Sequence, residues 1–125
     1  MKTAALREAT ITRSVIGAFF EVYNTLGFGF VEQLYKTALE HELDARGHRV
    51  DREVPVQVSY KEHIIGTYRI DMVIDQKLII EAKSTLALSP SAPRQLYNYL
   101  HASKLKVGLL LHFGPKPRFY RQICD

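Results

Sequence analysis

The chain has 125 residues, of which 46% are apolar and 24% are charged, and its formal net charge is +4. These proportions match globular proteins and exclude an intrinsically disordered or fibrous chain, so we expect a single domain over residues 1–125. No apolar run approaches the roughly 20 residues that span a bilayer, and the opening MKTAALREATITR has no apolar stretch typical of a secretory signal. We therefore expect a cytoplasmic protein with no membrane partner. The single cysteine excludes a disulfide framework and a cysteine-rich zinc site.

Two amphipathic helices are predicted at the start of the chain. Apolar residues recur at helical spacing from about Thr10 to Leu26, where two glycines, Gly27 and Gly29, break the pattern. A second helix is predicted from about Val31 to Arg46, with Gly47 in the position of a C-terminal cap. Each helix has one apolar face, so both should pack against the same core.

Strands dominate the rest of the chain. Alternating and β-branched residues predict three successive strands, at Glu53–Tyr60, Ile64–Ile74 and Leu78–Ser84. Pro55 places the first strand at an edge of its sheet or at the beginning of its pairing, because proline cannot donate a ladder hydrogen bond.

A helix and a further strand follow. Ser89 and Pro90 predict a helix start, which Pro93 could shift, and the helix should end near Ser103. The continuous apolar run Lys106–Phe113 predicts a strand covered on both faces, and Arg118–Ile123 predicts a short final strand. The order predicts a small α/β domain around one mixed sheet, with a helical crossover before the strand that begins at Lys106.

The most informative segment is the acidic hairpin between Ile70 and Lys83. If the chain turns about Gln76, one face of the hairpin carries only apolar pairs, Met72 with Ile80, Ile74 with Leu78 and Ile70 with Ala82. The other face then carries three pairs, Asp71 with Glu81, Arg69 with Lys83 and Val73 with Ile79. Two carboxylates would therefore face each other across the strands.

Opposed like charges destabilise a sheet, so this face needs a neutralising group. One candidate is a divalent cation such as Mg²⁺, which prefers carboxylate oxygens; another is Lys83, which shares a face with Glu81. Two acids and a lysine suit metal-assisted hydrolysis, in which the metal activates water and the lysine positions it. An ordinary solvated face with a Lys–Glu ion pair is the alternative, and Val73 and Ile79 on the same face argue against it.

These residues resemble a known nuclease pattern. Asp71 followed by Glu81-Ala82-Lys83 is similar to the D…(D/E)xK core of the PD-(D/E)XK nuclease superfamily. The segment GFVEQLY carries Gly29, Glu32 and Tyr35 as the GxxExxY signature, which names a protein family placed in that superfamily. The segment QLYNY resembles the QxxxY motif of RecB-type nucleases. The resemblance covers roughly residues 16–114.

The resemblance implies a restriction-endonuclease-like core, with an antiparallel β-meander, a crossover helix and a further strand after the N-terminal helices. It implies that Asp71 and Glu81 bind Mg²⁺ or Mn²⁺, that Glu32 reaches the metal directly or through water, and that Lys83 orients the attacking water. Gln95 and Tyr99 would lie on one helical face near the substrate phosphate or Lys83. His112 departs from the family pattern, which has asparagine there, and Lys61 replaces a usual glycine.

Several of these residues also have a structural explanation. Glu32 lies in the first turn of its helix, where an acid is favoured by the helix dipole. Tyr35 could belong to the core, and Gly29 could provide backbone freedom before the helix. Gln95 and Tyr99 could be ordinary helix residues beside a buried leucine stripe.

The distribution of charge favours a nucleic-acid partner. Residues 1–93 have a net charge of −1, whereas residues 94–125 carry six basic side chains and one acidic one. We expect Arg94, Lys104 and Lys106 to lie beside the acidic site and to bind a phosphate backbone. The sequence therefore predicts a metal-dependent nuclease that acts most readily on DNA. The alternative is a catalytically silent nuclease fold for nucleic-acid binding or assembly, in which a homodimer could supply the surface that so short a chain lacks.

Overall fold

The computed structural model describes residues 8–125. The prediction that the opening of the chain is not a secretory signal falls partly on residues 1–7, which lie outside that range. The described chain forms three helices and five strands: α1 (Ala9–Leu26), α2 (Glu32–Ala45), β1 (Val50–Tyr60), β2 (His63–Ile74), β3 (Leu78–Lys83), α3 (Ala92–Ser103), β4 (Val107–Phe113) and β5 (Pro117–Ile123). Within this range, no helix has the length and hydrophobicity that a membrane crossing needs.

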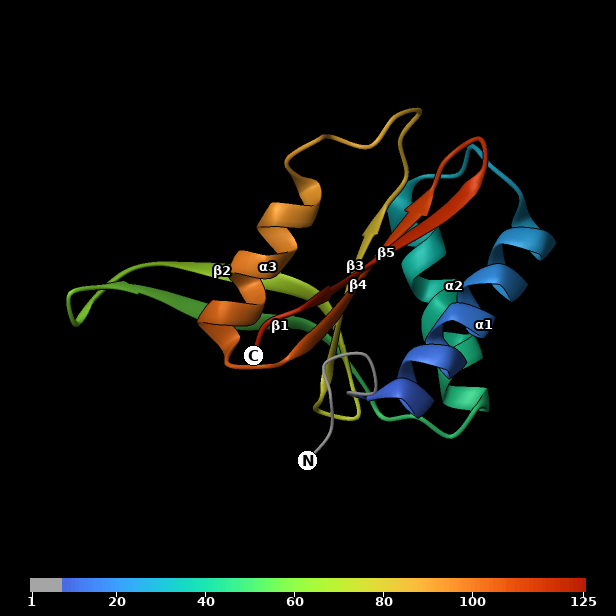
Figure 1. Ribbon diagram of the computed structural model, residues 1–125. Coiled ribbons are helices and arrows are strands. Elements are labelled where there is room, and N and C mark those ends of the chain that lie inside the picture. Colours follow the sequence, from blue (N-terminus) through green and yellow to red (C-terminus); the bar gives the residue numbers. More distant parts are fainter. Residues whose placement is uncertain (1–7) are drawn as a thin grey trace.

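All five strands form one mixed sheet in the order β1-β2-β3-β4-β5 (Figure 1). Strands β1, β2 and β3 make an antiparallel meander, α3 crosses over to β4, which runs parallel to β3, and β5 returns antiparallel to β4. The predicted α/β architecture is confirmed, with two N-terminal helices, a β-meander, a crossover helix and a further strand. Pro55 lies in the edge strand β1, as its missing N–H requires.

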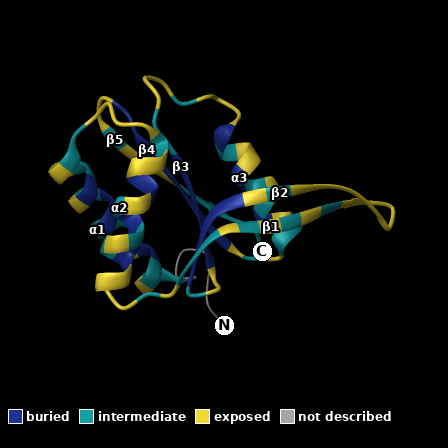
Figure 2. Cartoon of the chain, turned by 180° about the vertical axis from the view of Figure 1, so that it is seen from behind, coloured by how far each residue is buried: buried dark blue, intermediate teal, exposed yellow. Residues whose placement is uncertain are grey.

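The helices cover both faces of the sheet and give it two apolar cores (Figures 1 and 2). Helices α1 and α2 pack on one face, around a core that includes Phe19, Tyr35, Leu39, Met72 and Ile80. Helix α3 packs on the other face, around a core that includes Ile79, Leu96, Leu100 and Leu110. Every residue of β4 is buried, which confirms a strand covered on both sides. Burying each large apolar side chain contributes about 1.5–3 kcal/mol, so these two cores fix the central strands firmly.

The predicted register of the acidic hairpin is confirmed near its turn and wrong beyond it. Strands β2 and β3 pair Met72 with Ile80, Val73 with Ile79 and Ile74 with Leu78. The pairing ends there, so the predicted pairs Asp71 with Glu81 and Arg69 with Lys83 do not form in the ladder. Ile70 and Ala82 do not share a face either, because Ile70 lies in the core under α3 and Ala82 in the core under α1 and α2.

The alternation of side chains in β2 breaks at Asp71, because Ile70 lies in the core under α3 and Met72, two residues later, lies in the core under α1 and α2. On the β1 side, the pairing skips Glu53, whose φ of 53° lies in the left-handed region. On the β3 side, the backbone N–H of Ala82 donates a hydrogen bond to the Asp71 carboxylate instead of to a strand carbonyl. At this point a hydrogen bond to a side chain therefore takes the place of a hydrogen bond between the two strand backbones. Strand alternation alone does not predict such a replacement.

Two element boundaries also differ from the sequence prediction. Helix α3 begins at Ala92 rather than at Ser89, because a turn closed by the Ala92 N–H and the Ser89 carbonyl (3.0 Å) precedes it. Pro93 then lies in the first turn, where its missing N–H removes no helical hydrogen bond. Strand β1 begins at Val50, before the predicted start, because β2 is long enough to pair with it there.

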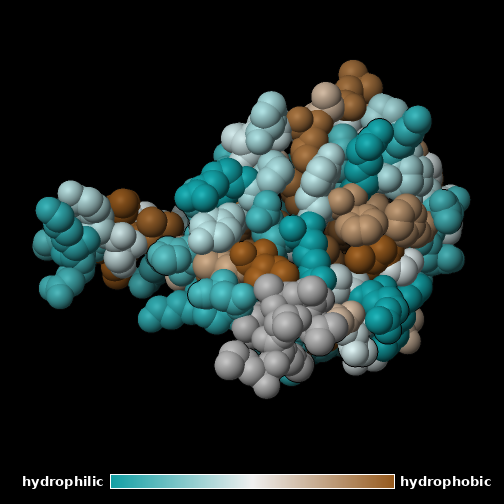
Figure 3. Space-filling view, in the orientation of Figure 1, coloured by the Kyte–Doolittle hydropathy of each residue, from teal (hydrophilic) through white to brown (hydrophobic). Residues whose placement is uncertain are grey.

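The outer part of the β1–β2 hairpin projects away from the body of the molecule (Figure 1). Its tip is exposed, and Lys61 and Glu62 form the turn with φ values of 46° and 71° (Figure 2). The exposed side chains there include Tyr60, Ile64 and Ile65, and Figure 3 shows apolar atoms near the end of the projection. The sequence predicted the turn but did not predict that the arm would stand clear of the core.

Candidate active site

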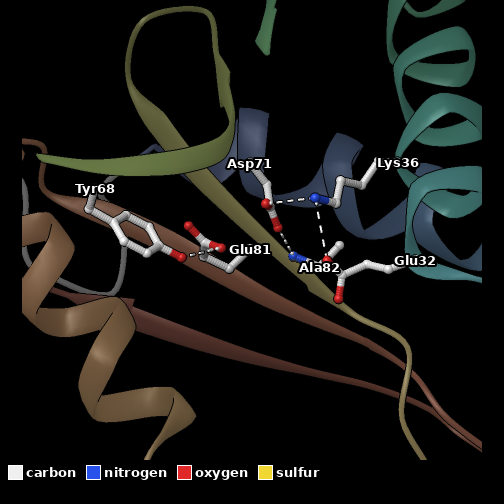
Figure 4. A network of polar contacts seen from close by, with 6 residues as sticks. All are labelled: Glu32, Lys36, Tyr68, Asp71, Glu81 and Ala82. Atoms are coloured by element: carbon white, nitrogen blue, oxygen red, sulfur yellow. Dashed lines mark hydrogen bonds and ion pairs between the residues drawn. The ribbon is translucent and has the colours of Figure 1, made fainter. Parts of the chain in front are cut away.

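The Asp71 carboxylate lies at the centre of a polar network between β3 and α2 (Figure 4). Its Oδ1 accepts a hydrogen bond from Lys36 Nζ at 2.9 Å, and its Oδ2 accepts one from the Ala82 N–H at 2.8 Å. Lys36 Nζ also lies 3.3 Å from Oε2 of Glu32, one turn earlier on α2. Burial would lower the pKa of Lys36, but Asp71 and Glu32 together outweigh it and raise that pKa above 10.5. Lys36 is therefore a fixed cation beside Asp71.

Glu81 lies on the α3 side of the sheet and is only 3% exposed. The Tyr68 hydroxyl donates to its Oε2 at 3.3 Å, whereas its Oε1 is buried with no hydrogen-bond partner among the described residues. Burial, followed by the charge of Asp71, raises the pKa of Glu81 to about 8, although Lys83 acts in the opposite direction. Burial likewise raises the pKa of Tyr68, and Glu81 raises it further, so this phenol stays protonated and keeps its role as donor.

Lys83 ends β3 two residues after Glu81, on the same side of the strand. It makes no hydrogen bond or ion pair with the rest of residues 8–125 and is half-buried. In the sheet it pairs with His112 of β4, which in turn pairs with Arg118 of β5. Side chains in register share a face, so Lys83 and the exposed Arg118 flank His112 in one row. Lys83 and Arg118 are thus two cations on the face that holds Glu81, and neither is shown in an ion pair with an acid of residues 8–125.

The two residues of the QxxxY segment have different surroundings. Tyr99 stacks on Tyr68, with ring centroids 3.7 Å apart and an interplanar angle of 13°, and Tyr68 in turn bonds to Glu81. Tyr99 is therefore linked to the site through another side chain. Gln95 lies one turn earlier on α3 and is exposed, with no side-chain hydrogen bond to Lys83.

The GxxExxY segment forms the loop and first turn that seat α2 against β3. Gly29 has a φ of 113°, which only glycine adopts readily. The Tyr35 hydroxyl donates to the Gly27 carbonyl and accepts from the Phe30 N–H, and its ring stacks on Phe113 in the core. The Ser84 hydroxyl, directly after Lys83, donates to the Phe30 carbonyl at 2.7 Å. Tyr35 is therefore a structural residue that holds the loop before Glu32.

A divalent metal is compatible with part of this arrangement. Among residues 8–125, no three His, Cys, Asp or Glu side chains converge closely enough to hold a metal by themselves. Mg²⁺, however, keeps several waters and is often bound by one or two carboxylates. The charge of Asp71 adds to burial in raising the pKa of Glu81, and Oε1 of Glu81 has no hydrogen-bond partner among residues 8–125. These two residues fit such an ion, whereas Glu32 is held by Lys36.

Lys104 and Lys106, which were expected beside the acidic site, lie elsewhere in the structure. Lys104 and Lys106 precede β4, whose first residue, Val107, pairs with Leu78 at the other end of β3 from Lys83. At about 3.3 Å per residue, that places them roughly 16 Å from the site along the strand. The expectation that they lie beside the acidic site is therefore wrong, because α3 carries the chain to the opposite end of the sheet. Arg94, in the first turn of α3, lies over the Tyr97 ring at 4.7 Å.

Sequence reasoning missed residues that touch the site. Lys36 follows Glu32 by four residues, a spacing that signals an ion pair on a helix and could have been used. Tyr68 carried no comparable signal, because its contact with Glu81 depends on the break in alternation of β2 at Asp71. His112 Nε2 bonds to the Thr85 carbonyl at 2.9 Å and holds the loop after Lys83. Since a carbonyl only accepts, Nε2 carries the proton of this bond.

A groove of about 1010 Å³ lies between β1 and the C-terminal end of α3. It is lined by residues such as Glu53, Val56 and Leu105 and includes none of Asp71, Glu81 and Lys83. The three residues of the acidic site therefore do not line this groove.

Comparison with known proteins identifies the family of this chain. The family model of the PD-(D/E)XK nuclease superfamily matches residues 9–122. The chain belongs to the PD-(D/E)XK nuclease superfamily.

One solved structure and the curated proteins add little beyond the fold. The chain is similar to the protein described as "Crystal structure of SSO0001", with a TM-score of 0.55 and 20% sequence identity. The similarity covers 74% of this chain and 50% of that one, so this PD-(D/E)XK chain spans half the length of its structural relative. No curated protein matches.

Proposed function

We propose that this protein is a divalent-metal-dependent nuclease that hydrolyses phosphodiester bonds, with DNA as its preferred substrate. The observation that carries this proposal is that Asp71, Glu81 and Lys83 lie near one another where the pairing of β2 with β3 ends. Among residues 8–125, Oε1 of Glu81 is buried with no hydrogen-bond partner and Lys83 makes no hydrogen bond or ion pair, and both features suit metal-assisted hydrolysis.

Each residue would have a distinct role at this site. Asp71 and Glu81 would hold Mg²⁺ or Mn²⁺, and Glu32 would join them, directly or through water, through the carboxylate oxygen that its ion pair with Lys36 leaves available. The bound ion would polarise a phosphoryl oxygen and lower the pKa of a coordinated water. Lys83 would orient the attacking water.

Residues on α3 and β5 would hold the substrate. Tyr99, positioned by its stack on Tyr68, and the exposed Gln95 would contact the phosphate or orient Lys83. Arg94 and Arg118 would contact the backbone beside the reacting phosphate. Lys104 and Lys106 would contact a duplex only where it continues to the opposite end of the sheet, as in recognition of an extended polyanion.

Two short segments of this chain also carry the motifs of narrower groups within the superfamily. We assign the chain to the GxxExxY family on Gly29, Glu32 and Tyr35, and its α3 segment to the RecB-type QxxxY motif on Gln95 and Tyr99. We also propose a cytoplasmic location.

The direct test is cleavage of labelled single- and double-stranded DNA by the purified protein with Mg²⁺ or Mn²⁺. We expect metal-dependent cleavage that Lys83→Ala reduces by about 100-fold or more, because positioning and proton-transfer groups typically contribute that much. Mn²⁺ binding should survive Lys83→Ala, because this residue is not a ligand, and should be lost in Glu81→Ala. Cleavage that persists in both variants would show that the catalytic assignment is wrong.

A catalytically silent module for nucleic-acid binding or assembly is the second candidate. Two observations favour it: Asp71 already has a cation partner in Lys36, and the exposed hairpin tip offers Tyr60, Ile64 and Ile65 to a partner such as a second copy of the chain. DNA affinity that is indifferent to metal and to Asp71→Ala would support this candidate. A dimer that dissociates when Ile65→Asp is introduced would support the assembly role.

A further inference from the structure

Lys36 occupies the space between two of the proposed metal ligands. Its side chain is 9% exposed, and its Nζ lies 2.9 Å from Oδ1 of Asp71 and 3.3 Å from Oε2 of Glu32 (Figure 4). Its neighbours on α2, Tyr35 and Leu39, are fully buried in the core, so the helix cannot shift easily to withdraw it. The ammonium group is therefore held among the acids by its own helix.

The carboxylate oxygens of Asp71 and Glu81 differ in whether they have a hydrogen-bond partner. Both oxygens of Asp71 are occupied, one by Lys36 and the other by the Ala82 N–H. Oε1 of Glu81 is buried and has no partner among residues 8–125. An ion that approached Glu81 and sought a second carboxylate ligand would meet Oδ1 of Asp71 already bound to a positive charge.

We propose that Lys36 is a built-in cation that holds Asp71 and Glu32 in the metal-free protein and competes with the divalent metal for Asp71. The proposal rests on the metal site proposed above and assigns a role to a residue outside the nuclease signature. When the metal binds, Lys36 retains Glu32 as its partner, since the two lie one helical turn apart. Lys36 thus weakens metal binding and keeps the acids in place until the metal arrives.

Metal affinity without substrate tests this competition. Mn²⁺ binding is measured by electron paramagnetic resonance and by calorimetry for the wild type and for Lys36→Met, which keeps the length of the side chain and removes its charge. We expect Lys36→Met to bind Mn²⁺ about tenfold tighter or more, because a unit positive charge next to the ion is removed. Lys61→Met, at the hairpin tip, is the matched control and should leave the affinity unchanged. Equal or weaker binding by Lys36→Met overturns the proposal.

Thermal stability provides an independent readout. Lys36→Met leaves the buried Asp71 carboxylate without its cation, so the metal-free variant should melt at a lower temperature than the wild type. Mn²⁺ should then raise the melting temperature of the variant more than that of the wild type, since the ion replaces the missing charge. Lys36→Gln, which keeps a donor to Asp71, serves if the methionine variant unfolds without metal. Equal increments in wild type and variant overturn the proposal.

Asp71→Asn separates this inference from the proposed function. Asp71→Asn should abolish high-affinity Mn²⁺ binding both as a single substitution and in combination with Lys36→Met. Binding that survives Asp71→Asn would refute the metal site itself and the competition with it. Binding that is lost in Asp71→Asn but unchanged in Lys36→Met would leave the metal site standing and refute only the role of Lys36.

Discussion

Replacing Glu81 by glutamine should stabilise the metal-free protein, and the gain should grow with pH. Glutamine has nearly the same shape as protonated glutamate, and it is neutral at every pH. Burying it therefore avoids the cost of removing a charged carboxylate from water. The pKa of Glu81 is raised from 4.5 to about 8 by burial and by Asp71, so the folded state binds a proton that the unfolded state releases. The stability that this proton contributes is fully present below about pH 4.5 and is lost as pH rises through about 8.

The magnitude follows from the size of the shift. Each pKa unit corresponds to about 1.4 kcal/mol, so the full change across this window is about 5 kcal/mol for a side chain as buried as Glu81. Wild type and Glu81→Gln should therefore have similar free energies of unfolding near pH 5. Near pH 8.5 the variant should be more stable by several kcal/mol.

Urea unfolding followed by circular dichroism in EDTA, from pH 5 to pH 8.5, measures this difference. Glu21→Gln, at an exposed position on α1, is the control and should show no pH-dependent gain. A difference between wild type and Glu81→Gln that stays flat over the whole range would refute the reasoning, because Glu81 would then not be held protonated by burial and by Asp71.

Two further substitutions test the packing and the charge of the site. Gly114→Ala should destabilise the protein by about 1–3 kcal/mol in urea unfolding, because the new Cβ would lie 2.6 Å from Cε1 of His112; Gly66→Ala, with no atom within 4 Å, should be close to neutral. Arg118→Ala should weaken binding of a short DNA duplex several-fold and reduce its salt dependence, as measured by fluorescence anisotropy, whereas Lys104→Ala should have a smaller effect. The reverse order of the last two variants would place the DNA at the other end of the sheet.

Apolar alternation was sufficient to predict the central hairpin. The pairs from Met72–Ile80 to Ile74–Leu78 follow from burying one set of side chains on each face, since a one-residue slip would expose all of them. The same alternation wrongly predicted that Asp71 pairs with Glu81. The ladder ends before these residues, and the backbone N–H of Ala82 donates to the Asp71 carboxylate, a contact that a pattern of apolar residues does not reveal.

The spacing of residues in the sequence predicted which side chains share a face of one strand. It was less successful in predicting which residues of different strands and helices lie close together. Glu81 and Lys83 share a face because strands alternate, and this could be read directly from the sequence. The basic residues after Pro93 were expected at the acidic site because they follow it in the chain. The crossover helix separates them, so that Arg118, late in the sequence, lies in register with Lys83, whereas Lys106 does not.

The central claim is that Asp71 and Glu81 together bind the metal that supports hydrolysis. A crystal of the protein soaked in Mn²⁺ and measured at the manganese absorption edge tests it most directly. We predict an anomalous difference peak between the two carboxylates, with Oε1 of Glu81 as a ligand and Lys36 turned towards Glu32. Anomalous density that is absent there, or that appears only at other acids on the surface, would contradict the account.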